Sequence, residues 1–193
     1  SITNIISGFI ITYMRPYQLG DRIKINDIEG VVVYRNLLIT RVRTLKNEEI
    51  TIPNSNILNH PTVNYSHLSN EYPLILHTKV TIGYDVPWRQ VHELLQKAAT
   101  ATEGVLVEPK PFVIQESLND FYVCYEINAY TDQPHTMHLI YGVLHQNIQD
   151  KFFEAGVEIM SPHYTSLRDG NTTAVPPQYR PKDYTADGFI FKK

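Results

Sequence analysis

The sequence of 193 residues contains a single cysteine, Cys124, so it cannot form an internal disulfide or a cysteine-rich zinc module. Sparse cysteine of this kind is typical of a reducing compartment. An excess of positive charge is also missing, because 17 Lys and Arg stand against 20 Asp and Glu and give a net charge of −3. Since nucleic-acid-binding domains usually show the opposite balance, no nucleic-acid partner is predicted.

Motifs of the common enzyme classes are absent as well. The sequence has no phosphate-binding loop, dinucleotide fingerprint, nucleophile elbow or HExxH pattern. Cys124 lies in a strand-like stretch between Val123 and Tyr125, which predicts a buried, inert thiol. We therefore predict no enzyme activity and no cofactor.

Eight histidines raise the question of a metal site. The cluster that merits a test comprises His135, His138 and His145, the last two seven residues apart on one predicted helix face. No carboxylate or cysteine completes an obvious ligand set around them. We therefore predict a solvated helix face and no metal.

Charged residues are missing from the first fourteen positions, where apolar residues recur at the three-and-four spacing of a helix. The helix is predicted to end at Arg15-Pro16, since a residue before proline is pushed out of the helical region. At about 1.5 Å per residue the segment is roughly 21 Å long, short of the roughly 30 Å of a bilayer core. It is too short for a complete membrane span. The apolar positions are Ile2, Ile5, Ile6, Phe9, Ile10 and Tyr13.

Three interpretations of this helix stay open: a core helix of a soluble domain, an interfacial helix, or the end of a membrane span. A signal peptide is not predicted, because a charged start and a small-residue cleavage site are missing. A polar strip runs along the same helix, and facing a water-filled pore its small residues would be well placed. The strip consists of Thr3, Asn4, Ser7 and Gly8.

From Gly20 the period changes to two, which predicts strands at 22–26, 31–44, 49–52 and 62–66, with a turn at 27–30. Asn54 or Ser55 is expected to cap a short helical turn at 56–59. Short, closely spaced strands favour a small, strongly bent sheet or barrel. Four basic residues lie in these predicted strands, namely Arg22, Lys24, Arg41 and Arg43. They face either anionic headgroups or partner subunits, or they are solvated strand charges.

The second half of the sequence predicts a folding unit of a different type. Strands are expected at 73–82, 112–116, 121–131 and 157–160, with helices at 87–102 and 136–155. The order β-α-β-β-α-β is that of a ferredoxin-like unit, with two helices on one face of an antiparallel sheet. From 166 to 193 periodicity disappears, which predicts an extended tail, with a possible strand at 189–191. The fold class is therefore α+β.

Several short blocks occur in one order and at one spacing. They are Arg15-Pro16-Tyr17, Gly20-Asp21-Arg22-Ile23-Lys24-Ile25, Glu29-Gly30-Val31-Val32, Thr40-Arg41-Val42-Arg43-Thr44, Ile52-Pro53-Asn54-Ser55 and Val63-Asn64-Tyr65-Ser66. With later blocks such as Gly156-Val157-Glu158-Ile159, they resemble the MscS-like family of mechanosensitive channels over about residues 1 to 165.

This resemblance implies a division of the chain. Residues 1–15 would be the distal part of the family's pore-lining helix, with preceding membrane helices missing, and 16–66 its Sm-like β domain. Residues 67–165 would be its α/β domain, and 166–193 an extended tail. Residues expected on the pore or lipid side of the helix are Ile2, Asn4, Ile5, Ser7, Gly8, Phe9 and Tyr13; those expected to shape the family's backbone are Arg15, Pro16, Gly20, Asp21, Gly30, Arg41, Pro53, Asn54 and Asn64.

The resemblance also implies a function. Seven copies would form a vestibule with side portals, on the cytoplasmic side of a bacterial inner membrane. The channel would open under membrane tension and release ions and small solutes on hypoosmotic stress. Its expected partners are further copies of itself and membrane lipids. Two alternatives stay open, a ligand-regulated channel or regulatory domain and an Sm-like RNA-binding module, although the net charge disfavours RNA.

Overall fold

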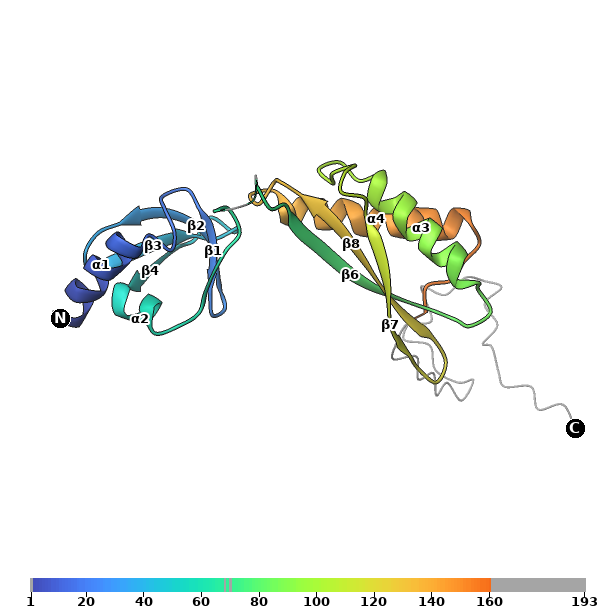
Figure 1. Ribbon diagram of the computed structural model, residues 1–193, viewed down its shortest axis with the longest axis horizontal. Coiled ribbons are helices and arrows are strands. Elements are labelled where there is room, and N and C mark those ends of the chain that lie inside the picture. Colours follow the sequence, from blue (N-terminus) through green and yellow to red (C-terminus); the bar gives the residue numbers. More distant parts are fainter. Residues whose placement is uncertain (1, 68, 70, 161–193) are drawn as a thin grey trace, which may run out of the picture. The chain divides into compact units, whose positions relative to one another are not determined.

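A computed structural model describes residues 2–67, 69 and 71–160, and the predicted tail at 166–193 lies outside them. Residues 1–160 form one compact unit, in which the apolar side chains gather into two separate cores. We call residues 2–66 the β lobe and residues 74–160 the α/β lobe, and Figure 1 shows the elements of each.

The β lobe is a five-stranded antiparallel sheet with two helices (Figure 1). Its strand order is β4-β3-β2-β1-β5. The elements are α1 (Ile2–Met14), β1 (Arg22–Ile25), β2 (Ile28–Arg35), β3 (Ile39–Arg43), β4 (Glu49–Pro53), α2 (Asn54–Leu58) and β5 (Thr62–Asn64).

Alternating side chains of the strands fill the core of the β lobe, as the period of two predicts. Ile23, Val42 and Ile52 are buried there beside Ile11 of helix α1. The backbone of Arg43 approaches Gly30 of β2 so closely that only glycine fits, because an added Cβ would lie 2.2 Å from the backbone oxygen of Arg43. The sheet therefore brings the helix and the strands into one core.

Several boundaries in this lobe differ from the predicted ones, among them those at Asn36 and Asn26. The predicted strand at 31–44 divides into β2 and β3, because the Asn36 side chain accepts hydrogen bonds from the backbone N–H of Leu38 and Ile39, at 2.8 and 2.9 Å. The predicted turn at 27–30 ends earlier, since Asn26 takes the positive φ of 50° and β2 begins at Ile28. In both places asparagine supplies the turn geometry.

The α/β lobe is a three-stranded antiparallel sheet in the order β6-β8-β7, with two helices on one face (Figure 1). Its buried core lies between the sheet and the helices, and includes Leu95, Ile127, Leu144 and Phe152. The elements are β6 (Leu74–Ile82), α3 (Trp88–Thr100), β7 (Phe112–Leu118), β8 (Val123–Thr131) and α4 (Met137–Glu154). The fold class is α+β, as predicted.

The fourth strand predicted at 157–160 does not form within the described residues. Val157 is buried in the core, and Met160 donates one backbone hydrogen bond of 2.8 Å to the oxygen of Thr81 on β6. A single ladder bond fixes the segment beside the edge of the sheet without making it a strand. Gly156, which has a φ of 66°, ends α4 just before this segment.

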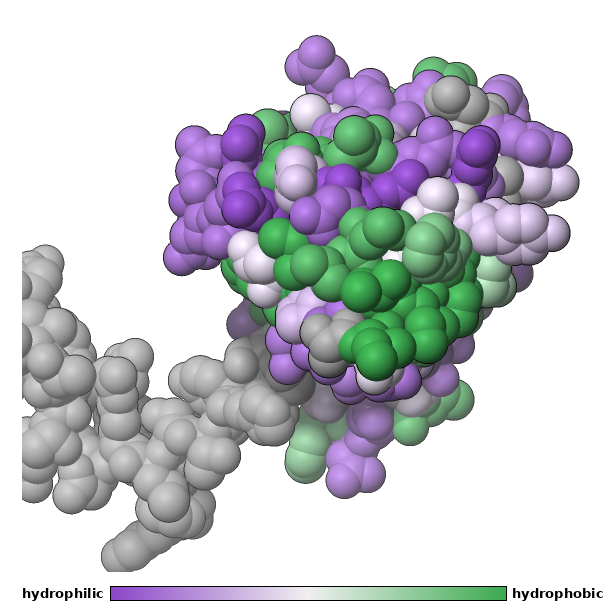
Figure 2. All heavy atoms as spheres, turned by 90° about the vertical axis from the view of Figure 1, so that its left-hand side faces the viewer, coloured by the Kyte–Doolittle hydropathy of each residue, from purple (hydrophilic) through white to green (hydrophobic). Residues whose placement is uncertain are grey.

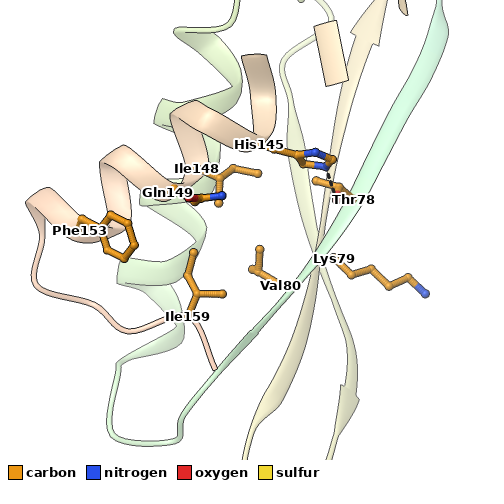
Figure 3. A pocket seen from close by; sticks show the side chains of 8 residues that line it. All are labelled: Thr78, Lys79, Val80, His145, Ile148, Gln149, Phe153 and Ile159. Atoms are coloured by element: carbon orange, nitrogen blue, oxygen red, sulfur yellow. Dashed lines mark hydrogen bonds between the residues drawn. The ribbon is translucent and has the colours of Figure 1, made fainter. Parts of the chain in front are cut away.

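Beside β6 the lobe has a cavity of about 350 Å³, shown in Figure 3. Its wall combines the apolar Val80, Ile148 and Ile159 with the polar His145 and Gln149. The imidazole of His145 points to Thr78, and its Nε2 lies 2.9 Å from the Thr78 hydroxyl. One of the polar groups in this wall, the His145 imidazole, is therefore already engaged in an internal hydrogen bond.

Among the helices that the structure describes, none has the length and apolar character needed to cross a membrane. Helix α1 has 13 residues, in agreement with the expected length.

Candidate functional site

Helix α1 presents a broad apolar surface that no other described residue covers. Figure 2 looks onto the side of the molecule that carries the N-terminus, and the apolar side chains there form one continuous patch. Phe9 is 60% exposed and Tyr13 is 90% exposed. The exposed apolar residues of the helix are Ile2, Ile5, Ile6, Phe9, Ile10, Tyr13 and Met14. A patch of this size marks an interaction surface.

The opposite side of α1 packs on the rest of the β lobe, and it includes Ser7 and Gly8 of the predicted polar strip, whereas Thr3 of that strip is exposed. Ser7, Gly8 and Ile11 are the buried residues of the helix. A Cβ on Gly8 would lie 2.1 Å from the backbone oxygen of Leu37, so glycine is required for this approach. The structure thus buries Ser7 and Gly8, with Gly8 against the loop between β2 and β3, and leaves Ile2, Ile5, Phe9 and Tyr13 exposed.

Asn4 joins the two helices of the β lobe. Its side-chain oxygen accepts a hydrogen bond of 3.1 Å from the backbone N–H of Ser55 in the first turn of α2. The residue before α2 is Pro53, which has no side chain that can cap the helix. Since the first N–H groups of a helix lack partners within it, Asn4 supplies from α1 the cap that α2 lacks. The predicted cap by Asn54 or Ser55 is therefore wrong.

Five of the residues that are expected to shape the family's backbone lie close together where the chain leaves α1. Arg15 has a φ of 48° and donates its backbone N–H to the oxygen of Ile11, so the helix ends at Met14, just before Arg15 and Pro16. The amide of Asn64 donates to the oxygen of Pro16 at 3.1 Å and to the carboxylate of Asp21 at 2.8 Å. Gly20 takes a φ of 90° within the same turn. This network fixes the point where the helix meets the sheet.

Tyr17, Thr40 and Asn54 form a buried polar cluster in the β lobe, and of these only Asn54 is among the residues expected from the sequence to have a structural role. The Thr40 hydroxyl donates to the Asn54 side-chain oxygen at 3.0 Å and lies 2.9 Å from the Tyr17 hydroxyl. The Asn54 amide donates to the backbone oxygen of Asn36 at 2.9 Å. Burial raises the pKa of Tyr17, against the opposing effects of the Thr40 hydrogen bond and of Arg35. Thr40 stands in one of the blocks that carry the family resemblance, but its residue type indicates no buried polar role, because threonine is ordinary in a strand.

Replacing Thr40 by valine should lower the free energy of unfolding of the β lobe by about 1–2 kcal/mol. The substitution keeps the shape of the side chain but leaves the Asn54 oxygen and the Tyr17 hydroxyl without a buried partner. Calorimetry measures the change. The control Thr40→Ser retains the hydroxyl and should lose less stability than the valine variant; an equal loss would contradict a role for the hydrogen bonds.

The four basic residues of the β lobe have different surroundings. Arg41 bonds Glu49 at 3.2 Å and lies over the Tyr34 ring, 5.1 Å from its centre. Arg43 forms an exposed ion pair with Glu49 at 4.0 Å, and Lys24 is exposed; that either residue faces a lipid headgroup or a partner subunit stays a prediction. Arg22 is 1% exposed, so the prediction that it faces a headgroup, a partner subunit or solvent is wrong.

The three candidate metal-binding histidines do not come together. His145 bonds Thr78, and Nδ1 of His138 lies 3.4 Å from Nη1 of Arg22. His135 accepts a hydrogen bond from Arg22 through its backbone oxygen, and its imidazole makes no hydrogen bond to a described residue. Within residues 2–67, 69 and 71–160, no three His, Cys, Asp or Glu residues are placed to hold a metal.

Cys124 is half-buried, not fully buried as expected, and its thiol donates to a Glu116 carboxylate oxygen at 3.4 Å. Burial is the largest cause of the raised pKa of the thiol, and the hydrogen bond and the charge of Glu116 raise it further. Lys79 pairs with the same carboxylate. Since the thiolate is the reactive form, this arrangement keeps Cys124 unreactive near neutral pH.

Replacing Glu116 by glutamine should speed the alkylation of Cys124 by iodoacetamide severalfold at pH 8. Loss of the carboxylate lowers the pKa of the thiol, so a larger fraction is thiolate at that pH. Mass spectrometry over time gives the rate. In the control Glu126→Gln a weaker charge effect is removed, and a smaller increase is expected. If Glu116→Gln left the rate unchanged, the carboxylate would not control the thiol.

Two family models match the chain in succession. "Mechanosensitive ion channel, beta-domain" matches residues 1–67, and "Mechanosensitive ion channel MscS, C-terminal" matches residues 76–159. The chain is 28% identical over 162 residues to the miniconductance mechanosensitive channel MscM of Escherichia coli, covering 83% of this chain and 14% of the relative. The mechanosensitive channel MscK of the same species is 28% identical over 127 residues, or 66% of this chain and 11% of the relative.

Solved structures agree on the fold. The crystal structure of Helicobacter pylori MscS in its closed state has a TM-score of 0.70 at 19% identity, and the match covers 86% of this chain and 64% of that one. A cryo-EM structure of AtMSL1 gives a TM-score of 0.62 at 19% identity over 83% of this chain and 56% of that one. With both domain models matched in order over most of its described length, the chain belongs to the MscS family of mechanosensitive ion channels.

Proposed function

We propose that this chain is the cytoplasmic region of a tension-gated channel that releases ions and small solutes on hypoosmotic stress. The observation that supports this most strongly is the pairing of the two family domains, in order, behind a helix whose apolar side is exposed. Because the chain spans only 11–14% of the first curated relatives it matches, the activity proposed is that of a longer protein.

In this proposal the exposed side of α1 lies against lipid or against neighbouring copies of the chain. Apolar side chains such as Phe9 and Tyr13 are stable in either setting and unfavourable in water. A ring of copies, seven in the proposed assembly, would bury them and form the vestibule around the permeation path. The protein would reside in the inner membrane of a bacterium, with the α/β lobe on the cytoplasmic side.

Tension acts on such a protein through the difference in area between its closed and open states. The described residues would transmit the state of the pore and support it. The junction of Arg15, Gly20, Asp21 and Asn64 holds the end of α1 to the sheet. A displacement of the helix would therefore reach the β lobe directly.

The test is a patch-clamp recording of the full-length protein that carries this chain, reconstituted in liposomes, with suction raised in steps. Openings that follow tension reproducibly, and are absent from liposomes without the protein, would support the proposal. If the membrane ruptured without any openings, the tension-gated function would be refuted. Openings that require an added solute would favour the ligand-regulated alternative.

A further inference from the structure

Arg22 is a charged residue at the start of β1 whose side chain is almost completely buried, with 1% exposed. A buried guanidinium is costly unless all its donors find partners. Its Nε and Nη2 donate to one carboxylate oxygen of Glu29, at 3.0 and 2.6 Å. Glu29 lies on the neighbouring strand β2, so this ion pair holds the guanidinium to its own lobe.

The remaining nitrogen of the guanidinium reaches the α/β lobe. Nη1 donates to the backbone oxygens of Pro134 and His135, at 2.9 and 3.1 Å. It also lies 3.4 Å from Nδ1 of His138, in the first turn of α4. The planar guanidinium holds five N–H donors in a fixed fork, so it can bond Glu29 and the α/β lobe through different nitrogens at once.

Arg22 is also bound through its main chain to the segment that leaves the β lobe. Its backbone N–H donates to the Ser66 hydroxyl at 2.9 Å, and its backbone oxygen accepts from the N–H of Tyr65 at 2.9 Å. In the part of the chain that the structure describes, the side-chain hydrogen bonds between residues 2–66 and residues 74–160 all come from Arg22. One side chain therefore carries the polar contact between the lobes.

We propose that Arg22 is a positioning residue that couples the β lobe to the start of helix α4. Glu29 orients the guanidinium, and the backbone oxygens of Pro134 and His135 accept its hydrogen bonds. While the hydrogen bonds from Arg22 to Pro134 and His135 are formed, a movement of β1 is transmitted to the start of α4. When these hydrogen bonds are absent, β1 and α4 move independently of each other. The effect on gating rests on the proposed function, but the coupling itself does not.

Hydrogen exchange with mass spectrometry on the 193-residue chain tests the coupling. In Arg22→Leu, the backbone N–H groups of Leu139 and Ile140, which bond the oxygen of Thr136 at the start of α4, should exchange about tenfold faster. The core strands of both lobes should keep their wild-type rates. Arg22→Lys should restore part of the protection, because its amine can reach one set of partners.

Arg41→Leu is the matched control, since Arg41 is paired with Glu49 in the same lobe without contacting the α/β lobe. It should leave the exchange of Leu139 and Ile140 unchanged. Two results would overturn the proposal: no change at these positions in Arg22→Leu, or an equal acceleration throughout the β lobe. The second would mean that Arg22 only stabilises its own sheet.

Patch-clamp recordings of the full-length protein add the functional readout. Arg22→Leu should shift the tension of half-maximal opening, while Arg41→Leu should leave it at the wild-type value. An unchanged tension in Arg22→Leu would overturn the role of the coupling in gating. If the wild type did not open at all, the proposed function would fail, and the exchange experiment would still decide whether Arg22 couples the lobes.

Discussion

Replacing Phe152 by alanine should lower the free energy of unfolding of the α/β lobe by about 3–5 kcal/mol. Phe152 is 0% exposed and belongs to the core between the helices and the sheet. Its removal costs the transfer free energy of the ring and leaves a cavity that the rigid surroundings fill only in part. For a domain of this size such a loss is a large share of the total stability.

The measurement is urea denaturation followed by tryptophan fluorescence. Trp88 is the only tryptophan and lies at the start of α3, so the signal reports on the α/β lobe. The next residue of the same helix supplies the control, because Phe153 is 66% exposed. Phe153→Ala should change the stability by less than about 0.5 kcal/mol. Equal losses in the two variants would mean that the core is not packed as described.

Much of the fold could be predicted from periodicity because its elements have clear patterns and strong boundaries. Pro16, Pro87 and Gly156 lie at helix ends for reasons that act within a few residues. The alternation of β1 and the apolar stripe of α4 likewise depend on neighbours in the sequence. The fourth strand was harder, since pairing at an edge depends on long-range contacts, and only Met160 pairs with β6.

The site could be predicted only in part, because the sequence does not reveal which side of a helix faces its own domain. The apolar stripe of α1 suggests burial, yet the buried side is the one with Ser7, Gly8 and Ile11. Close approach of backbones decides this, and that is a property of the folded chain. Similarly, Asn4 caps a helix 51 positions away in the sequence, which no local pattern can show.

Arg22 illustrates the same limit for charge. An arginine in an alternating strand is normally solvated, and nothing beside it in the sequence indicates otherwise. Its burial depends on Glu29 across the sheet and on the oxygen of Pro134, 112 positions along the chain. Distances of this kind enter only with the tertiary structure.

Replacing Gly8 by alanine should displace α1 from the β lobe, at a cost of about 2–3 kcal/mol in the free energy of that contact. The new methyl group would lie 2.1 Å from the backbone oxygen of Leu37, and neither group can rotate away. The displaced helix would pull Asn4 from Ser55, so the Ser55 N–H should exchange with solvent at least about tenfold faster.

The same substitution at Gly142, in the exposed part of α4, is the control. An added Cβ there meets nothing within 4 Å, so Gly142→Ala should raise the stability by about 0.5–1 kcal/mol through the helix preference of alanine. One chemical change thus has opposite expected signs at two helical glycines. In the full-length protein, Gly8→Ala should also change the tension needed for opening, because α1 is the element nearest the membrane in the proposed assembly. If the Ser55 N–H kept its protection in Gly8→Ala, the contact of Gly8 with the loop between β2 and β3 could not be the one that holds Asn4 to α2.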